Sequence, residues 1–219
     1  ERSAQRNYGA RKSKGKYFLF LDADMVLEKD IVEECVLRIT KKNQQRIYAV
    51  IIPEKSYGEG FWAKCKVLER SFYEGVEWIE AARFYQHDIF WEFGGYDENL
   101  TGPEDFDLPQ RIKTKYGKQF IGRINAHIHH NEGKLTLGKS LCKKFYYGKK
   151  MREYYTNKEN RQYAKQQGSI FNRYMLFFSK PKKLFRNPVL GFGMLCMKTS
   201  EMIALGLGMV FSKKTHFQK

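Results

Sequence analysis

The chain has 219 residues, 42% of them hydrophobic, and carries 40 Lys and Arg against 24 Asp and Glu, a net charge of +16. This apolar content excludes an intrinsically disordered chain, and the length suits one domain with an appendage. Residues 139–219 hold 18 basic against 3 acidic residues, so a net +15 of the excess charge lies in this third. We therefore expect residues 139–219 to face an anionic partner, either lipid head groups or nucleic acid.

The first predicted strand is Tyr17–Leu21, a run of five apolar residues that is typical of a strand buried on both faces. It ends at Asp22 and Asp24, two carboxylates one residue apart. In open α/β sheets, ligands bind just beyond the carboxyl ends of parallel strands. Carboxylate oxygens there suit Mg²⁺ or Mn²⁺, which in turn would hold phosphates. The motif is therefore a candidate metal and phosphate site.

A helix and a second strand follow this motif. Asp30 is expected to cap the helix, with Glu33 as its capping-box partner. Residues 47–52 form the second buried strand, and strand, helix and strand in this order predict a parallel, right-handed crossover. Apolar residues from Phe61 to Phe72 have the spacing of a further amphipathic helix.

The pattern between Trp78 and Phe93 is short and irregular. A helix is then predicted from Glu104 to about Tyr116, with Pro109 tolerated because it falls in the first turn. Its acidic start, including Asp107, also has a purely structural explanation, since carboxylates favour helix N-termini.

A third strand over residues 119–124 leads to three histidines, His127, His129 and His130. Alternation along an extended chain puts His127 and His129 on one face and His130 on the other. A lone histidine is usually structural, but a cluster beside a candidate metal site can supply a ligand. Both interpretations stay open from the residues alone.

Four sequence blocks occur in a family's characteristic order. They are Gln5-Arg6-Asn7-Tyr8-Gly9-Ala10 with Lys14-Gly15, then Leu21-Asp22-Ala23-Asp24, then residues 93–98 with 102–108, and finally His130-Asn131-Glu132-Gly133. Together they resemble the family 2 glycosyltransferases. The resemblance implies the GT-A fold, a Rossmann-like mixed α/β sheet flanked by helices. Residues 1–138 would form the C-terminal part of that catalytic domain, because the family's opening nucleotide-binding strands do not precede Glu1.

By this resemblance, Asp24 is the direct metal ligand and Asp22 contacts the ribose or a metal-bound water. His130 is the third metal contact, with His127 and His129 as alternatives. The donor-binding set is completed by Asn7, Lys14 and Arg83. Arg83 lies in a strand-like segment and could contact a phosphate, although a surface salt bridge explains it equally well.

Transfer from a nucleotide sugar releases a diphosphate, whose developing charge a divalent ion would neutralise. The acceptor hydroxyl must lose a proton, and a carboxylate within reach can take it. By resemblance this base is Asp105, with Glu104 beside it and in position to bind the acceptor. One base opposite one leaving group is a single displacement, so we expect inversion at the anomeric carbon.

The basic region 139–219 is predicted to be helical. Leu137, Leu141, Phe145 and Gly148 fall at helical spacing, and residues 188–211 are mostly apolar but interrupted by Lys198 and Glu201. A lysine and a glutamate in the middle argue against a simple membrane span, although they could pair with each other. We therefore expect an amphipathic or hairpin-like membrane-associated segment, with a pair of ordinary core helices as the alternative.

The leading hypothesis is a metal-dependent, inverting, hexosyltransferase-like enzyme at the cytoplasmic face of the cell membrane. Its donor would be a UDP or GDP sugar, and its acceptor a lipid-linked or cell-envelope glycan. The four widely spaced cysteines match no metal site and predict reduced thiols, which fits that compartment. The Gln-x-x-Arg-Trp motif of processive synthases is absent. A catalytically silent fragment and a basic nucleic-acid-binding module are the alternatives.

Overall fold

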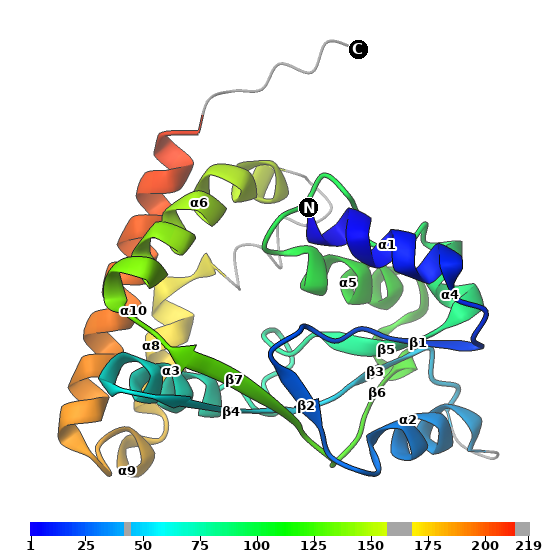
Figure 1. Ribbon diagram of the computed structural model, residues 1–219, viewed down its shortest axis with the longest axis horizontal. Coiled ribbons are helices and arrows are strands. Elements are labelled where there is room, and N and C mark those ends of the chain that lie inside the picture. The colour runs from blue at the N-terminus through cyan, green and yellow to red at the C-terminus, as the bar shows by residue number, and fades with distance from the viewer. Residues whose placement is uncertain (42–44, 157–167, 213–219) are drawn as a thin grey trace. The chain divides into compact units, whose positions relative to one another are not determined.

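The computed structural model describes residues 1–41, 45–156 and 168–212, with side chains described to residue 150 and from residue 168 (Figure 1). Contacts divide the chain into two compact units. The sheet unit comprises Glu1–Tyr57 and Arg70–Glu132, and the helical unit comprises Gly58–Glu69 and Gly133–Lys219. The charge pattern predicts a single boundary after residue 138, whereas contacts also assign the distant segment Gly58–Glu69 to the C-terminal unit. The predicted α/β class is confirmed.

A four-stranded mixed sheet forms the centre of the sheet unit. Its order is β1 (Tyr17–Leu19), β5 (Ala82–Gln86), β3 (Ala49–Ile51), β6 (Ile121–Arg123). β5 is antiparallel to both of its neighbours, and β3 is parallel to β6. The strands expected to form a crossover, β1 and β3, therefore run the same way but are separated by β5. This central strand lies in the stretch whose sequence pattern is irregular.

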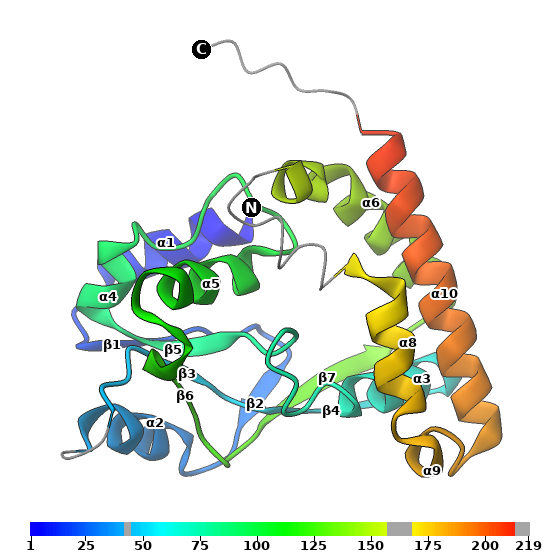
Figure 2. The same ribbon diagram turned by 180° about the vertical axis from the view of Figure 1, so that it is seen from behind.

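Helices cover both faces of this sheet (Figures 1 and 2). One face carries α1 (Arg2–Lys12), α4 (His87–Glu92) and α5 (Glu104–Tyr116), and the other carries α2 (Ile31–Thr40). Aromatic rings fill the first layer, as in the contact of Phe20 with Phe90 at 5.2 Å between ring centroids. Ile31 and Cys35 of α2 pack into the second layer. The site described below is therefore built on a sheet buried on both sides.

Two predictions about helix starts are only partly right: Asp30 precedes α2 and α5 begins at Glu104, both as predicted, but the details differ. Asp30 occupies the position before α2, but its side chain makes no capping hydrogen bond there. Pro109 lies inside α5, which begins at Glu104, so it falls in the second turn. A proline there cannot donate a hydrogen bond to the carbonyl of Asp105, four residues earlier.

A smaller sheet extends from the ends of the first one. Its order is β2 (Met25–Leu27), β7 (Ile128–Lys134), β4 (Glu54–Glu59). The antiparallel pairing of β2 with β7 sets Met25 opposite His130. A short 3₁₀ turn, η1 (Lys118–Phe120), precedes β6. The register of β2 and β7 brings the Asp22–Asp24 motif beside the histidine cluster.

The helical unit consists of α3 (Phe61–Ser71) up to Glu69, followed by four further labelled helices. These are α6 (Leu137–Thr156), α8 (Ile170–Phe178), α9 (Pro181–Leu184) and α10 (Pro188–Val210). α10 is one continuous helix of 23 residues, so the hairpin-like alternative is wrong. By length and composition it is the one helix among the described residues that could cross a membrane.

Glycines let α6 and α10 approach closely, and the two helices lie side by side in Figures 1 and 2. A Cβ atom added at Gly208 would lie 2.2 Å from the carbonyl oxygen of Phe145, and one at Gly148 would lie 2.2 Å from that of Leu205. Small residues are required at such a contact because any side chain would separate the two backbones. This pair of glycines fixes the packing of the two long helices of the unit.

Candidate active site

The Asp22 carboxylate lies between two arginines. After β1 the chain stays beside β5, where the amide of Phe20 donates to the carbonyl of Arg83 at 2.9 Å. Asp22 Oδ1 lies 2.8 Å from Arg6 Nη2, and Oδ2 lies 3.8 Å from Arg83 Nη2. Burial alone would raise the pKa of Asp22, but the hydrogen bond from Arg6 and the charge of Arg83 lower it. Asp22 is therefore a carboxylate held ionised by its neighbours.

Arg6, on α1, joins Asp22 to the start of α5. Its Nη1 donates to Asp105, and the same nitrogen lies 4.0 Å from Glu104 Oε1. The guanidinium also lies over the Tyr96 ring, 5.3 Å from its centroid. A planar guanidinium presents donors in a fixed fork, so it can hold two carboxylates in a set orientation. Residues 22 and 105, far apart in sequence, thus share one cation.

The two carboxylates that open α5 have different surroundings. The Glu104 side chain is 1% exposed and accepts a hydrogen bond from the backbone amide of Gly102. Burial and the neighbouring Asp105 raise the pKa of Glu104. The Asp105 side chain is 24% exposed. Of the two, Asp105 is the carboxylate that a substrate can reach, and Glu104 shapes the loop before it.

Arg83, on β5, is a buried residue rather than part of a surface salt bridge. Its Nε and Nη2 both lie 2.8 Å from Glu54 Oε1, at the start of β4. Burial alone would raise the pKa of Glu54, but His130 and Arg83 lower it well below its usual range. Glu54 thus joins the arginine side of the site to the histidine cluster.

Asp24 and His130 come together across β2 and β7. His130 Nε2 lies 3.5 Å from Asp24 Oδ2, and its Nδ1 lies 3.2 Å from Glu54 Oε2. The backbone amide of Asn131 donates to the Asp24 carbonyl at 2.8 Å, which fixes the loop. A histidine that ligates a metal commonly directs its other ring nitrogen to a carboxylate, as His130 does to Glu54. Asp24 is the most exposed member, with 54% of its side chain accessible.

Asp24 and His130 can supply part of the ligand set that a divalent ion needs. Within the described ranges, no group of three or more His, Cys, Asp or Glu side chains is gathered to hold a metal. Mg²⁺, however, is commonly bound by one or two carboxylates, with substrate phosphates and waters as the remaining ligands. Asp24 supplies one such carboxylate and has His130 beside it, whereas the Asp22 oxygens are directed at arginines.

The other two histidines point away from Asp24. His127 Nε2 lies 3.0 Å from Glu74 Oε1, and His129 Nε2 lies 3.2 Å from Glu28 Oε1. The alternation expected from the sequence is confirmed, because His130 alone of the three faces Asp24.

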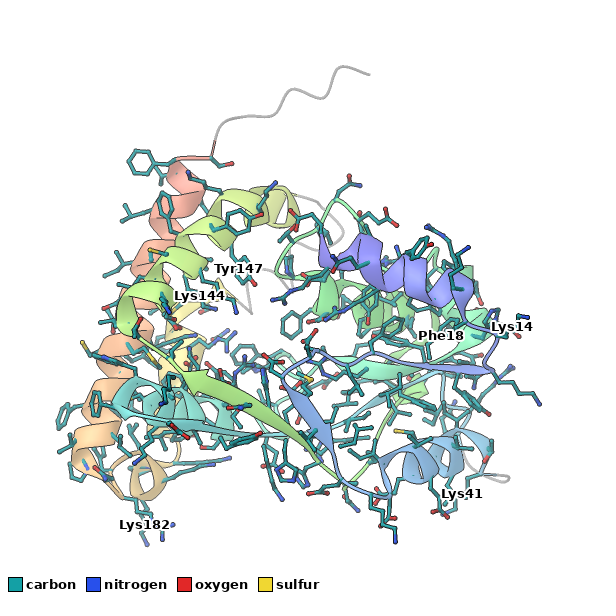
Figure 3. The ribbon with its side chains drawn as sticks, viewed as in Figure 1. Lys14, Phe18, Lys41, Lys144, Tyr147 and Lys182 are labelled. Carbon is teal, nitrogen blue, oxygen red and sulfur yellow. The ribbon has the colours of Figure 1, made fainter. Side chains whose placement is uncertain are left out.

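Asn7 and Lys14, predicted to bind the donor, lie in different surroundings. The buried Asn7 amide donates to the Tyr96 carbonyl at 2.8 Å and accepts from the Tyr96 amide at 3.0 Å. It thereby fixes the turn at Gly95, whose φ of +76° favours glycine. Lys14 is exposed, at the opposite end of β1 from Asp22 (Figure 3). The structure therefore does not bring Lys14 to Asp22, and donor binding by either residue stays a prediction.

Comparison with known families identifies the first part of the chain. Residues 1–96 match the family model described as Glycosyl transferase family 2. This stretch is therefore similar to the family 2 glycosyltransferases. The resemblance seen in the sequence is thus confirmed over α1 to the Tyr96 turn. A search of the curated proteins found no match.

The family 2 match includes Arg6, Asp22, Asp24 and Arg83 and ends before Asp105 and His130. The geometry adds these two later residues, since Asp105 contacts Arg6 and His130 contacts Asp24. The assignment of glycosyl transfer rests on the family, while the roles of the later residues rest on their contacts.

Arg6, Glu54 and Tyr96 are site residues that sequence reasoning missed. α1 buries Ser3, Asn7 and Ala10, two of which are polar, so it lacks the apolar stripe that marks a helix. Arg6 lies inside the first family block, next to Asn7, and this position was the one feature of the sequence that could have marked it as a site residue. Glu54 gives none, because its role depends on the pairing of β4 with β7.

Proposed function

We propose that the chain transfers a hexose from a nucleotide-sugar donor to a glycan acceptor, with inversion and with the help of Mg²⁺ or Mn²⁺. The observation that carries the proposal is the shared contact of Arg6 with Asp22 and Asp105. It joins a carboxylate of the family's donor-site motif to a carboxylate suited to act as a base. Glycosyl transfer in general follows from the family 2 match.

On the donor side, Asp24 and His130 would hold the divalent ion. Bound there, the ion supplies positive charge where negative charge develops on the leaving diphosphate. Glu54 orients His130 by its contact with Nδ1. Arg83, held by Glu54, keeps a second positive charge next to Asp22, which would contact the donor ribose.

On the acceptor side, Asp105 would accept the proton of the attacking hydroxyl. The bond from the anomeric carbon to the diphosphate oxygen breaks while the bond to the acceptor oxygen forms, and the proton passes to an Asp105 oxygen. One displacement of this kind inverts the anomeric configuration. Arg6 fixes the Asp105 carboxylate, so little reorganisation is needed when the acceptor binds.

The substrates are proposed by class. The donor is a UDP or GDP sugar, and the acceptor is a lipid-linked or cell-envelope glycan at the cytoplasmic face of the membrane. The support for a membrane-bound acceptor is the net +15 charge of residues 139–219 and the apolar helix α10.

Calorimetric titration with UDP and GDP, with and without Mn²⁺, tests the donor site. Binding of one nucleotide should require Mn²⁺ and should be lost in Asp24→Ala. The matched control is Asp30→Ala, an exposed aspartate whose side chain makes no capping bond, and it should bind as the wild type does. If this chain and one extended upstream of Glu1 both bind neither nucleotide, the donor site is refuted.

A second variant separates the base from the donor site. Asp105→Asn should abolish sugar transfer while nucleotide affinity stays within about threefold, because a base acts after the donor is bound. Asp88→Asn, at an aspartate with 97% of its side chain exposed, serves as the control. Full transfer activity in Asp105→Asn would remove Asp105 from the mechanism.

A further inference from the structure

The helix α10 carries its two charged residues on its buried side, and its exposed side is mostly apolar. Lys198 and Glu201 are 8% and 1% exposed. Besides Pro188 and Gly206, the exposed positions recur every three or four residues along the helix and carry Val189, Phe192, Cys196, Thr199, Ile203, Leu207 and Val210. Val189 and Phe192 are 69% and 65% exposed. A helix on the surface of a soluble domain has the opposite arrangement.

The buried charges of α10 are satisfied inside the helical unit. Lys198 Nζ lies 2.7 Å from Glu69 Oε1, and Glu201 Oε1 lies 2.8 Å from Lys66 Nζ, both partners being on α3. These partners explain how a lysine and a glutamate can occupy the middle of an apolar helix. They leave the outward side of α10 without any charged residue.

The neighbouring helix α8 repeats the pattern. Its exposed large side chains are all apolar: Ile170, Phe171, Met175 and Phe178. α8 packs on α10 through Tyr174, whose hydroxyl donates to the Leu195 carbonyl at 3.4 Å. The rings of Phe185 and Phe192 lie 5.8 Å apart, which extends the contact toward α9. We call the exposed side chains of α8 and α10 the apolar face.

Basic side chains lie on the segment of chain that connects the two helices of the apolar face. Lys180, Lys182 and Arg186 are all exposed, on and around α9 (Figure 3 labels Lys182). Contiguous apolar surface next to several cations is the combination that binds anionic bilayers, because apolar groups enter the interface while cations meet the head groups. A second protein chain would explain the apolar residues but not the adjacent cations.

We propose that the apolar face of α8 and α10 docks in the plane of an anionic lipid bilayer, with Lys180, Lys182 and Arg186 at the head groups. α10 lies in the interface rather than crossing it. Its buried side is packed on α3, which carries the exposed Lys64. A spanning α10 would carry that lysine into the hydrocarbon at high cost.

Flotation of the full chain with vesicles tests the docking, using phosphatidylcholine alone or mixed with phosphatidylglycerol. The double variant Phe192→Ser/Ile203→Ser should bind mixed vesicles at least about tenfold more weakly, since two apolar side chains no longer enter the interface. The matched control is Val32→Ser/Leu37→Ser on α2, because Val32 is 50% exposed and Leu37 is 58% exposed. The control should bind as the wild type does.

Charge reversal tests the lysines separately. Lys182→Glu/Arg186→Glu should weaken binding to mixed vesicles about fivefold or more for each residue changed, with little effect on vesicles of phosphatidylcholine alone. Lys14→Glu/Lys41→Glu changes the net charge equally at exposed positions of the sheet unit. If this control weakened vesicle binding equally, the net charge of the chain would explain the attraction to the lipid. The assignment of the apolar face as the docking surface would then be overturned.

Three further results would overturn the proposal. The first is no binding of the wild type to mixed vesicles. The second is a dimer in solution that Phe192→Ser/Ile203→Ser dissociates, which would assign the face to a second copy. The third is displacement from vesicles by single-stranded oligonucleotides, with tighter binding to them than to lipid. None of these measurements uses a nucleotide sugar, so their failure would leave the proposed sugar transfer untouched.

Discussion

Lys66 and Glu201 are 135 residues apart in the sequence, yet the lysine Nζ lies 2.8 Å from the glutamate Oε1. Both side chains are almost fully buried. Lys66 also lies 2.6 Å from Glu69 Oε2, which in turn pairs with Lys198. Two lysines and two glutamates therefore form one network between α3 and α10. Ion pairs of this kind fix one arrangement of two helices, because any slip would bury a charge without its partner.

Glu201→Gln should lower the free energy of unfolding by about 2–4 kcal/mol, since two buried lysines would then share Glu69 alone. The double variant Lys66→Met/Glu201→Gln should recover part of this loss, with a coupling free energy of about 1–3 kcal/mol. The coupling free energy is measured by urea unfolding of the wild type, the two single variants and the double variant. Additive effects would show that the network is not coupled. The exposed pair of Lys134 and Glu59 is the control, and Glu59→Gln should have almost no effect.

Two glycines of α10, two residues apart, should respond oppositely to alanine. Gly208→Ala should lower the free energy of unfolding by about 1–3 kcal/mol, because its Cβ would lie 2.2 Å from the Phe145 carbonyl oxygen. Gly206→Ala should be neutral or stabilising by up to about 1 kcal/mol, since nothing lies within 4 Å and alanine favours helix. Thermal unfolding of the two variants compares them directly. Equal effects would mean that α6 and α10 do not pack closely at Gly208.

These contacts mark what the sequence could and could not predict. The apolar run Tyr17–Leu21 and the helix starting at Glu104 have strong local signals, and both elements form, although the strand proper ends at Leu19. The central strand β5 gave only a strand-like segment around Arg83 in the sequence, because its neighbours, β1 and β3, come from distant parts of the chain. Only those neighbours make Ala82–Gln86 a buried strand.

The candidate site, like the fold, was predictable from the sequence only in part. The Asp22–Asp24 motif was predicted from its place after a buried strand, and Asp105 from the family resemblance. Their grouping depends on Arg6, a polar residue on a helix without an apolar stripe, and no periodicity marks such a residue. The pair of Lys198 and Glu201 that the sequence suggested does form, at 3.9 Å, but the closer partner of Lys198 is Glu69, which lies 129 residues away and has no local signal.

Lys144 should make stability depend on pH above neutrality. Burial, with help from Lys198 and Lys66, lowers its pKa to about 7 despite the nearby Glu201 and Glu69. The unfolded chain, with a lysine pKa near 10.5, then binds more protons between about pH 7 and 10.5. Stability attributable to Lys144 should therefore rise with pH through that window.

Lys144→Met should remove this rise and stabilise the protein at pH 7 by on the order of 1–3 kcal/mol. The measurement is the unfolding midpoint in urea at several pH values from 7 to 10, without lipid. Lys143→Met, at the exposed neighbouring position, should leave the pH dependence unchanged. An unaltered slope in Lys144→Met would show that Lys144 keeps its proton in the folded protein from pH 7 to 10.

Arg6 offers the sharpest test of the proposed active site. Arg6→Lys keeps the positive charge but replaces a planar fork by a point charge, which cannot hold Asp22 and Asp105 in fixed orientations at once. If Asp105 is the base, its misplacement should lower kcat by about 10- to 100-fold while KM for the donor changes much less. Arg11→Lys on the same helix is the control, because Arg11 is exposed and contacts Glu98, at 3.5 Å, and the Trp91 ring, but neither Asp22 nor Asp105. A variant Arg6→Lys with unchanged kcat would mean that the shared contact of Asp22 and Asp105 serves the fold alone, and the base would then have to be sought elsewhere.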